Sequence, residues 1–492
     1  MALDGRGPLS GLLLAVVVVI TSGCTAQSPL SSTGEADSPV AGQSATATIA
    51  SEPVDQPATS ESTTTSLPPT TVPPEPRRVI VEVHPPEAVV ELRSGSGFSH
   101  RGQGPEPVTV DVPAELVQVR VSAAGYQTYE GELTLADTQA GRSGDAAAEP
   151  IQATIWLDRP EQLVHKLFEV EVGGAPKGVA FTPDGSELWT TLLNSNGVEI
   201  IDVASGRSEG IIDLGKGAVE VIFNRSGDTA YVSQMETNSV YEIDVAQRTV
   251  TRRFNTNGAW TKVMALSPDE KTLYASNWID SNVSEIDLAT GNVTRLLRTV
   301  RTPRGLYPTT DGTGLYVTGF ETGQLQYFDL ATGESEVLLA TGGSMRHLVG
   351  SPDGSMVYAS DMTRDTIFAI DTASQEITEL ATTDRKPNTI DISPDGRVLF
   401  VSNRGANNPQ SYYLPGPEWG TVLLIDTASG TMLDAIIGGN QTTGLDVSTD
   451  GTLLAFSDLL DNRVVVYSVP PTEQLLAGNG GRYEAHLTEL TK

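Results

Sequence analysis

Short runs of apolar and β-branched residues alternate with turn residues from residue 173 to residue 469, and this pattern repeats about every 42 residues. An aspartate ending one of the runs marks each unit, and successive marks lie 42, 43, 42, 42, 55 and 42 residues apart. In the first unit, Pro, Asp, Asn and Gly at the turns predict strands over 178–182, 187–191, 198–203 and 209–214. Each unit therefore predicts four short strands. The marks are Asp202, Asp244, Asp287, Asp329, Asp371 and Asp426, with Ser468 in the seventh place.

Units of this length with four strands are typical of the blades of a β-propeller. The repeat therefore predicts an all-β fold with a seven-bladed propeller over residues 163–469. The seventh unit ends after three strands, because Pro470 and Pro471 cannot extend a strand ladder. We expect the strand-like run 164–172 to supply the missing outer strand, so that an N-terminal strand closes the ring and 470–492 form a C-terminal tail.

The N-terminus carries the pattern of an export signal. Arg6 precedes an apolar run over 9–20, which is too short to span a bilayer and suits the core of a signal peptide. Thr21-Ser-Gly-Cys24 follows and resembles a bacterial lipoprotein box, although Thr21 stands where that family usually has leucine. The resemblance implies a signal over 1–24, a lipidated Cys24 and an extracytoplasmic protein anchored to the membrane, in the periplasm or on the cell surface. An ordinary thiol is the alternative for this single cysteine.

Two further segments precede the repeat. Residues 25–77 are rich in Ser, Thr and Pro and predict a disordered tether, because they cannot bury a core. Residues 78–159 read as short strands and resemble a PEGA domain, a small extracytoplasmic β module, through Pro86-Glu-Ala88 and Gly125-Tyr126. The resemblance implies an interaction or spacer domain. The sequence departs from the family over 94–104, where we expect a longer loop.

The repeat resembles the YVTN-type repeat family, which contains propellers of lactonase-like and surface-layer type. Tyr316-Val-Thr-Gly319 carries the strand motif of the family, and Ser351-Pro-Asp-Gly354 and Ile425-Asp-Thr-Ala-Ser-Gly430 match its turn segments. The resemblance extends over all seven units and implies the fold. For function it implies only a choice among binding scaffolds, lactone hydrolases and subunits of redox enzymes.

The chain has a net charge of −31. Binding to nucleic acid depends on neutralising phosphates with Lys and Arg, so this charge argues against a nucleic-acid partner. A local basic cluster would be conspicuous against such a background, because its field would draw anions toward one point of an acidic protein.

Aligning the units places two columns of residues on the propeller face where ligands usually bind. The residue that opens the first strand is basic in four units: Lys177, Lys262, Arg304 and Arg346. One hypothesis is that these side chains, with His347 and Asn388 beside them, capture an anionic group. The other is that they form ion pairs with Asp361, Asp458 or a loop acid and tie the blades together. The column at the end of the second strand is polar or small apart from Leu192, and it includes Asn277, Asp361, Asn403 and Asp458.

The sixth unit carries thirteen extra residues between its second and third strands, on the same face. Insertions in repeat proteins often build the binding face. Tyr412, Tyr413 and Trp419 in this loop are side chains of the kind that anchor ligands, and the alternative is that they fold back and plug the channel.

The sequence contains no catalytic motif in a suitable context. We therefore expect a binding protein that needs no cofactor and whose ligand is a small anion or another protein. Whether it also catalyses a reaction is left open. The enzymatic alternative is a lactonase-like hydrolase that holds Ca²⁺ or Mn²⁺ with the oxygens of Asn277, Asp361, Asn403 and Asp458. A third alternative is a propeller subunit of a membrane redox complex.

Overall fold

The computed structural model describes residues 76–95, 97–112, 116–134 and 150–492. The predicted signal over 1–24 with Cys24 lies outside the described residues, as does the predicted tether up to residue 75. Within the described ranges, no helix is both long enough and apolar enough to cross a bilayer.

Residues 77–156 form two small sheets of the predicted β module, with strand orders β4-β1-β7 and β3-β2-β5-β6. Valines that alternate along the strands, such as Val79, Val81 and Val119, supply the core between them. The segment 94–104, expected as a loop, contains β3 paired with β2. The polar sequence of β3 has no alternating apolar residues, so the strand is recognised only from its backbone pairing with β2. The strands are β1 (Arg77–His84), β2 (Val89–Arg93), β3 (Ser99–Gln103), β4 (Val108–Val112), β5 (Leu116–Ser122), β6 (Tyr129–Thr134) and β7 (Ile151–Trp156).

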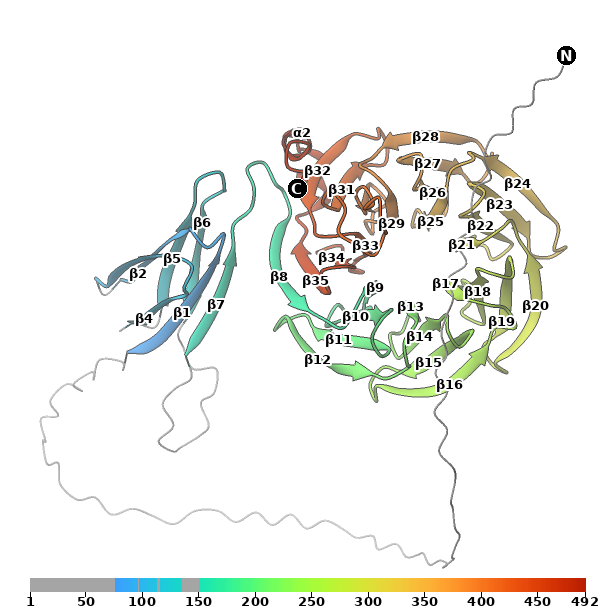
Figure 1. The fold of residues 1–492 in the computed structure, drawn as a ribbon, viewed down its shortest axis with the longest axis horizontal. Helices are drawn as coiled ribbons and strands as arrows, with labels where there is room; N and C mark the ends of the chain where they lie inside the picture. Colours follow the sequence, from blue (N-terminus) through green and yellow to red (C-terminus); the bar gives the residue numbers. More distant parts are fainter. Residues whose placement is uncertain (1–75, 96, 113–115, 135–149) are drawn as a thin grey trace, which may run out of the picture. The chain divides into compact units, whose positions relative to one another are not determined.

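Residues 165–468, all of them described, form seven four-stranded antiparallel sheets arranged around a centre (Figure 1). We number them sheets 1 to 7 in chain order. Sheet 1 contains β9 (Pro176–Phe181), β10 (Glu187–Leu192), β11 (Val198–Asp202) and β12 (Arg207–Ile212), and sheet 2 contains β13 (Ala218–Phe223), β14 (Thr229–Gln234), β15 (Ser239–Asp244) and β16 (Thr249–Asn255). Sheet 3 contains β17 (Thr261–Leu266), β18 (Thr272–Asn277), β19 (Asn282–Asp287) and β20 (Asn292–Arg298), and sheet 4 contains β21 (Pro303–Pro308), β22 (Gly314–Gly319), β23 (Gln324–Asp329) and β24 (Ser335–Ala340). Sheet 5 contains β25 (Met345–Gly350), β26 (Met356–Asp361), β27 (Thr366–Asp371) and β28 (Ile377–Thr382), and sheet 6 contains β29 (Pro387–Ile392), β30 (Val398–Asn403), β31 (Thr421–Asp426) and β32 (Met432–Ile437). Sheet 7 contains β33 (Thr442–Val447), β34 (Leu453–Asp458), β35 (Arg463–Ser468) and β8 (His165–Glu171). The predicted all-β, propeller-like fold is confirmed.

The first strand of each sheet is the innermost, and each of these inner strands contacts the next around the ring, including β33 with β9. Neighbouring sheets bury their faces against each other. Between sheets 3 and 4, for example, Val263 and Tyr274 pack with Leu315 and Phe328. Apolar packing therefore fills the spaces between the sheets and leaves the inner strands to line the centre.

The aspartate that marks the repeat caps the turn between the third and fourth strands. The side chain of Asp202 accepts a hydrogen bond from the backbone N–H of Ser205 at 2.7 Å, and Asp371 accepts one from that of Ser374 at 2.7 Å. An aspartate that bonds its own backbone a few residues later stabilises a tight turn. The mark is thus a folding feature of the repeat.

Every inner strand begins with a β-bulge. In sheet 5, Met345 pairs with Asp361 and Leu348 pairs with Ala359, so that Arg346 and His347 share one partner position. A bulge redirects side chains relative to a regular strand. Because of it, two consecutive residues, Arg346 and His347, both line the central cavity.

The C-terminal segment, expected only as a tail, contains α1 (Thr472–Leu476) and α2 (Gly481–His486), which pack against β32. His486 Nε2 lies 2.8 Å from Asp384 Oδ2, and Thr421 Oγ1 donates to the same oxygen at 2.7 Å. Both His486 and Asp384 are buried. This polar contact fixes the segment to sheet 6.

Candidate anion site in the central channel

The inner strands enclose a cavity of about 380 Å³ at the centre of the ring. It is lined by Lys177, Arg304 and Arg346 near the starts of their strands, and by Glu220, His347 and Asp446 further along theirs. The cavity therefore contains most of the predicted column of basic residues together with acidic residues that the sequence alignment did not single out.

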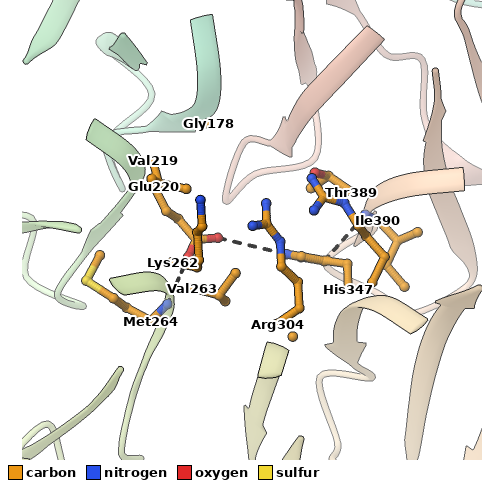
Figure 2. A network of polar contacts seen from close by, with 12 residues as sticks. Gly178, Val219, Glu220, Lys262, Val263, Met264, Arg304, His347, Thr389 and Ile390 are labelled. Atoms are coloured by element: carbon orange, nitrogen blue, oxygen red, sulfur yellow. Dashed lines mark hydrogen bonds and ion pairs between the residues drawn. The ribbon is translucent and has the colours of Figure 1, made fainter. Parts of the chain in front are cut away.

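The four predicted cations and a fifth lie close enough together for their charges to act on Lys177. Figure 2 shows two of them, Lys262 and Arg304, at the channel. Lys177, Lys262, Arg304 and Arg346 are each the second residue of an inner strand, at the bulge. Arg404, the first residue of the long loop after β30, was missed from the sequence, although it directly follows the aligned Asn403. We call Lys177, Lys262, Arg304, Arg346 and Arg404 the cation cluster.

These cations have few partners. The Nε of Arg346 donates to Asn388, Arg404 donates to Gln441, and Lys262 Nζ lies 2.9 Å from the sulfur of Met235. Within the described part of the chain, the guanidinium of Arg304 and the ammonium of Lys177 have no hydrogen-bond acceptor and no carboxylate at ion-pair distance. Arg304 and Arg346 are nevertheless only 7% exposed. Buried charge without a hydrogen-bond acceptor is unfavourable, so Arg304 and Lys177 are poorly compensated by the described residues around them.

The electrostatics of the cluster reflect this crowding. Burial, followed by the charges of Arg304 and Arg346, lowers the pKa of Lys262 to about 7. Burial also lowers the pKa of Arg304 and of Arg404 to about 10, and it holds the pKa of Lys177 well below its usual value. Desolvation and like charges both disfavour the protonated form. The charge of a bound anion would favour the protonated forms and so oppose both effects.

Glu220 and His347 face each other across the channel, one residue deeper than the cations. Glu220 Oε1 lies 4.0 Å from His347 Nε2, as Figure 2 shows. Burial raises the pKa of Glu220 to about 7, and burial with the charge of Arg346 lowers the pKa of His347 to about 3. His347 therefore lies in the predicted place but is neutral at pH 7, and it adds no positive charge to the cluster.

Four of the channel residues tie neighbouring inner strands together. Glu220 accepts the backbone N–H of Met264 at 2.8 Å, and His347 Nδ1 accepts that of Ile390 at 3.4 Å. Two strand positions further along, Asp391 accepts the N–H of Val447 at 2.8 Å and Asp446 that of Phe181 at 2.7 Å. In each case the donor lies in the next inner strand. These side chains use an oxygen or a nitrogen to join sheets that share no backbone ladder.

The predicted column at the end of the second strand serves the loops. Asp361, fully buried, accepts from Thr341 Oγ1 at 2.5 Å and from the backbone N–H of Ser344 at 2.9 Å. Asp458 forms an ion pair with Arg463 at 2.8 Å, and Asn277 donates to Ser284 at 2.7 Å. Neither aspartate pairs with the cation cluster. In the described ranges, no group of three or more His, Cys, Asp or Glu is placed to hold a metal. Asn403 likewise bonds within its own sheet, to Val401 at 3.2 Å.

The long loop spans residues 404–420 between β30 and β31, where the insertion was predicted. The ring of Tyr412 lies 5.8 Å from the guanidinium carbon of Arg404 and 3.9 Å from the ring of Tyr413. Trp419 instead contacts the C-terminal segment, where its N–H donates to Leu490 at 2.9 Å and its ring lies 4.3 Å from Lys492 Nζ. The tyrosines therefore belong to the channel side of the loop, and Trp419 anchors its other end.

One relative shows the family to which the chain belongs. Antigen Lp49 of Leptospira interrogans is 32% identical to this chain over 365 residues, which are 71% of the chain and 77% of the antigen. The chain belongs to the family of Antigen Lp49.

Two further comparisons concern the propeller of this Lp49-family protein. A family model described as a YNCE-like β-propeller matches residues 226–448, a range that includes Lys262, Arg304, Arg346 and Arg404. A chain of hydrazine synthase from Kuenenia stuttgartiensis superposes with a TM-score of 0.53 at 19% identity, over 60% of this chain and 96% of the other. At this identity the similarity shows the fold alone.

Proposed function

We propose that the protein is a binding module whose central channel captures an anionic group with the cation cluster. The observation that carries the proposal is the guanidinium of Arg304, which is 7% exposed and has no acceptor among the described residues. Guanidinium groups match carboxylate and phosphate in geometry, and charge-assisted hydrogen bonds are the strongest that such a group can form. Glu220 is the carboxylate whose charge acts on Arg304, and burial raises its own pKa to about 7.

The first expected result concerns sulfate. Sulfate should raise the Tm of the full-length protein by about 3 °C more than chloride at equal ionic strength, because a ligand that binds only the folded state stabilises it. Differential scanning fluorimetry over a sulfate titration measures this. Specific binding saturates at millimolar sulfate, whereas general stabilisation by salt keeps growing with concentration. A titration without a saturating component would contradict the proposal.

The affinity for sulfate should fall as the pH rises from about 6 to about 8. Lys262 and Glu220, each with a pKa of about 7, then lose a positive charge and gain a negative charge respectively, while sulfate keeps its charge. Because the folded pKa of Lys262 lies below its unfolded value, the unliganded protein gains stability from this group above about pH 7. Calorimetric titration at several pH values measures the affinity, and a constant value would show that Lys262 and Glu220 are not at the site.

The finer architecture is part of the same proposal. We infer that the seven sheets are blades of a propeller over 163–469, closed by β8 against β35, and that 470–492 form a segment docked on it. Residues 78–159 would form the PEGA-like module and 25–77 the tether. The lipoprotein box at Cys24 supports a lipid anchor, and similarity to a protein named as an antigen fits display outside the cytoplasm, on the bacterial cell surface. A ligand or partner protein would then be bound outside the cell.

A further inference from the structure

The residue two positions before the cation column has a left-handed backbone in six of the seven sheets. In the other sheets this residue is small or polar: Ala175, Gly217, Thr302, Ser344, Lys386 and Gln441. In sheet 3 it is Trp260, with φ 58° and an exposed fraction of 41%. The left-handed conformation costs a non-glycine residue about 1–2 kcal/mol. Neither the backbone nor the core therefore accounts for a tryptophan at this position.

Trp260 is part of an aromatic wall next to the cations. Trp278 donates its backbone N–H to the carbonyl of Trp260 at 3.1 Å, and the ring of Phe320 lies 5.0 Å from that of Trp278. Lys262 Nζ lies 5.1 Å from the ring of Trp260 and 5.7 Å from that of Trp278. The guanidinium carbon of Arg304 lies 5.6 Å from the ring of Trp278. We call Trp260, Trp278 and Phe320 the aromatic wall.

We propose that the anionic group captured by the cation cluster is carried on an aromatic ring, which packs against Trp260 while its oxygens bond Lys262 and Arg304. The inference rests on the proposed function. It adds the class of ligand: an aryl carboxylate or an aryl phosphate. Offset or edge-on packing of two aromatic rings contributes beyond the area that they bury, and it requires the exposed indole that Trp260 presents.

The test compares aryl probes with matched probes that lack the ring, by calorimetric titration of the full-length protein. Phenyl phosphate should bind about five- to tenfold more tightly than methyl phosphate, or benzoate more tightly than acetate by the same factor. Whichever pair shows the gain identifies phosphate or carboxylate as the group. In Trp260→Gly the gain should disappear while methyl phosphate or acetate binds as before, and Trp260→Phe should retain part of it.

The variant is suited to this test because glycine adopts the left-handed conformation without strain, which offsets part of the packing lost with the indole, so Trp260→Gly should still fold. Equal affinity for the aryl and the ring-free probes in the unaltered protein would overturn this inference and leave the proposed function intact. If none of the four probes binds and sulfate gives no saturating shift, the proposed function fails as well. A gain that survives in Trp260→Gly would also overturn the role of Trp260.

Discussion

Replacing Lys262 and Arg304 together by methionine is expected to weaken sulfate binding by at least about 100-fold and to raise the Tm of the unliganded protein by about 2 °C. Each hydrogen bond to a charged group contributes about 1.5–3 kcal/mol, so losing two removes most of the affinity. The stability should rise because the change removes two crowded charges, of which Arg304 has no acceptor in the described structure, and keeps their apolar volume. Calorimetric titration and thermal unfolding without sulfate measure the two effects.

Arg295→Met is the matched control. The Nε of Arg295 donates to Glu285 Oε2 at 2.8 Å, and its Nη2 donates to the carbonyl of Leu330 at 3.0 Å, so this cation is paired. Its removal should leave sulfate binding unchanged and lower the Tm. If the Lys262/Arg304 variant lost stability as the control does and still bound sulfate, the cations would be structural, which was the alternative hypothesis drawn from the sequence.

The sequence could place the cations because the repeat fixes their register. Once one unit is aligned, Lys177, Lys262, Arg304 and Arg346 fall at one strand position, and the strand position determines where each side chain begins. Their orientation depends on the bulge that starts each inner strand, which the sequence does not signal. Arg404 was not predicted, because it directly follows Asn403, the last residue of β30, and so lies outside the aligned strand positions.

The acidic residues of the channel could not be predicted in the same way. The acidic residues Glu220, Asp391 and Asp446 lie inside strands, at two different strand positions. At each of these positions an acidic residue occurs in only one or two of the seven units. The alternation of polar and apolar residues cannot distinguish a side chain that faces the channel from one that faces solvent. Their function, accepting an N–H from the next sheet, depends on the distance between sheets and therefore on the whole ring.

For the column at the end of the second strand, the sequence locates the residues but does not distinguish between two possible functions. Asn277, Asp361, Asn403 and Asp458 are all fully buried, and as a pattern of oxygens they also suit a metal site. The structure gives Asp361 and Asp458 separate sets of donors in sheets 5 and 7. Buried carboxylates that cap loops and carboxylates that bind metals have the same sequence signature, and only the positions of their partners distinguish them.

Asp361→Ala is expected to lower the free energy of unfolding by about 3 kcal/mol, equally with Ca²⁺, with Mn²⁺ and with a chelator. The substitution leaves four donors without their acceptor: Thr341 Oγ1 at 2.5 Å and the backbone N–H groups of Ser344, Thr363 and Arg364 at 2.9, 3.1 and 3.2 Å. A buried donor without a partner costs about 1–3 kcal/mol, and water that enters the space can satisfy some of them.

Urea denaturation of the two proteins under the three conditions measures this loss. Asp371→Ala is the control, because Asp371 caps a turn through Ser374 in the same sheet but lies nearer the surface, so its loss should be smaller. A stabilisation of the unaltered protein by Ca²⁺ or Mn²⁺ that Asp361→Ala abolishes would instead favour the metal-dependent hydrolase. Equal losses under all three conditions would assign Asp361 to the loops of sheet 5 and leave the cation cluster and the aromatic wall as the candidate site.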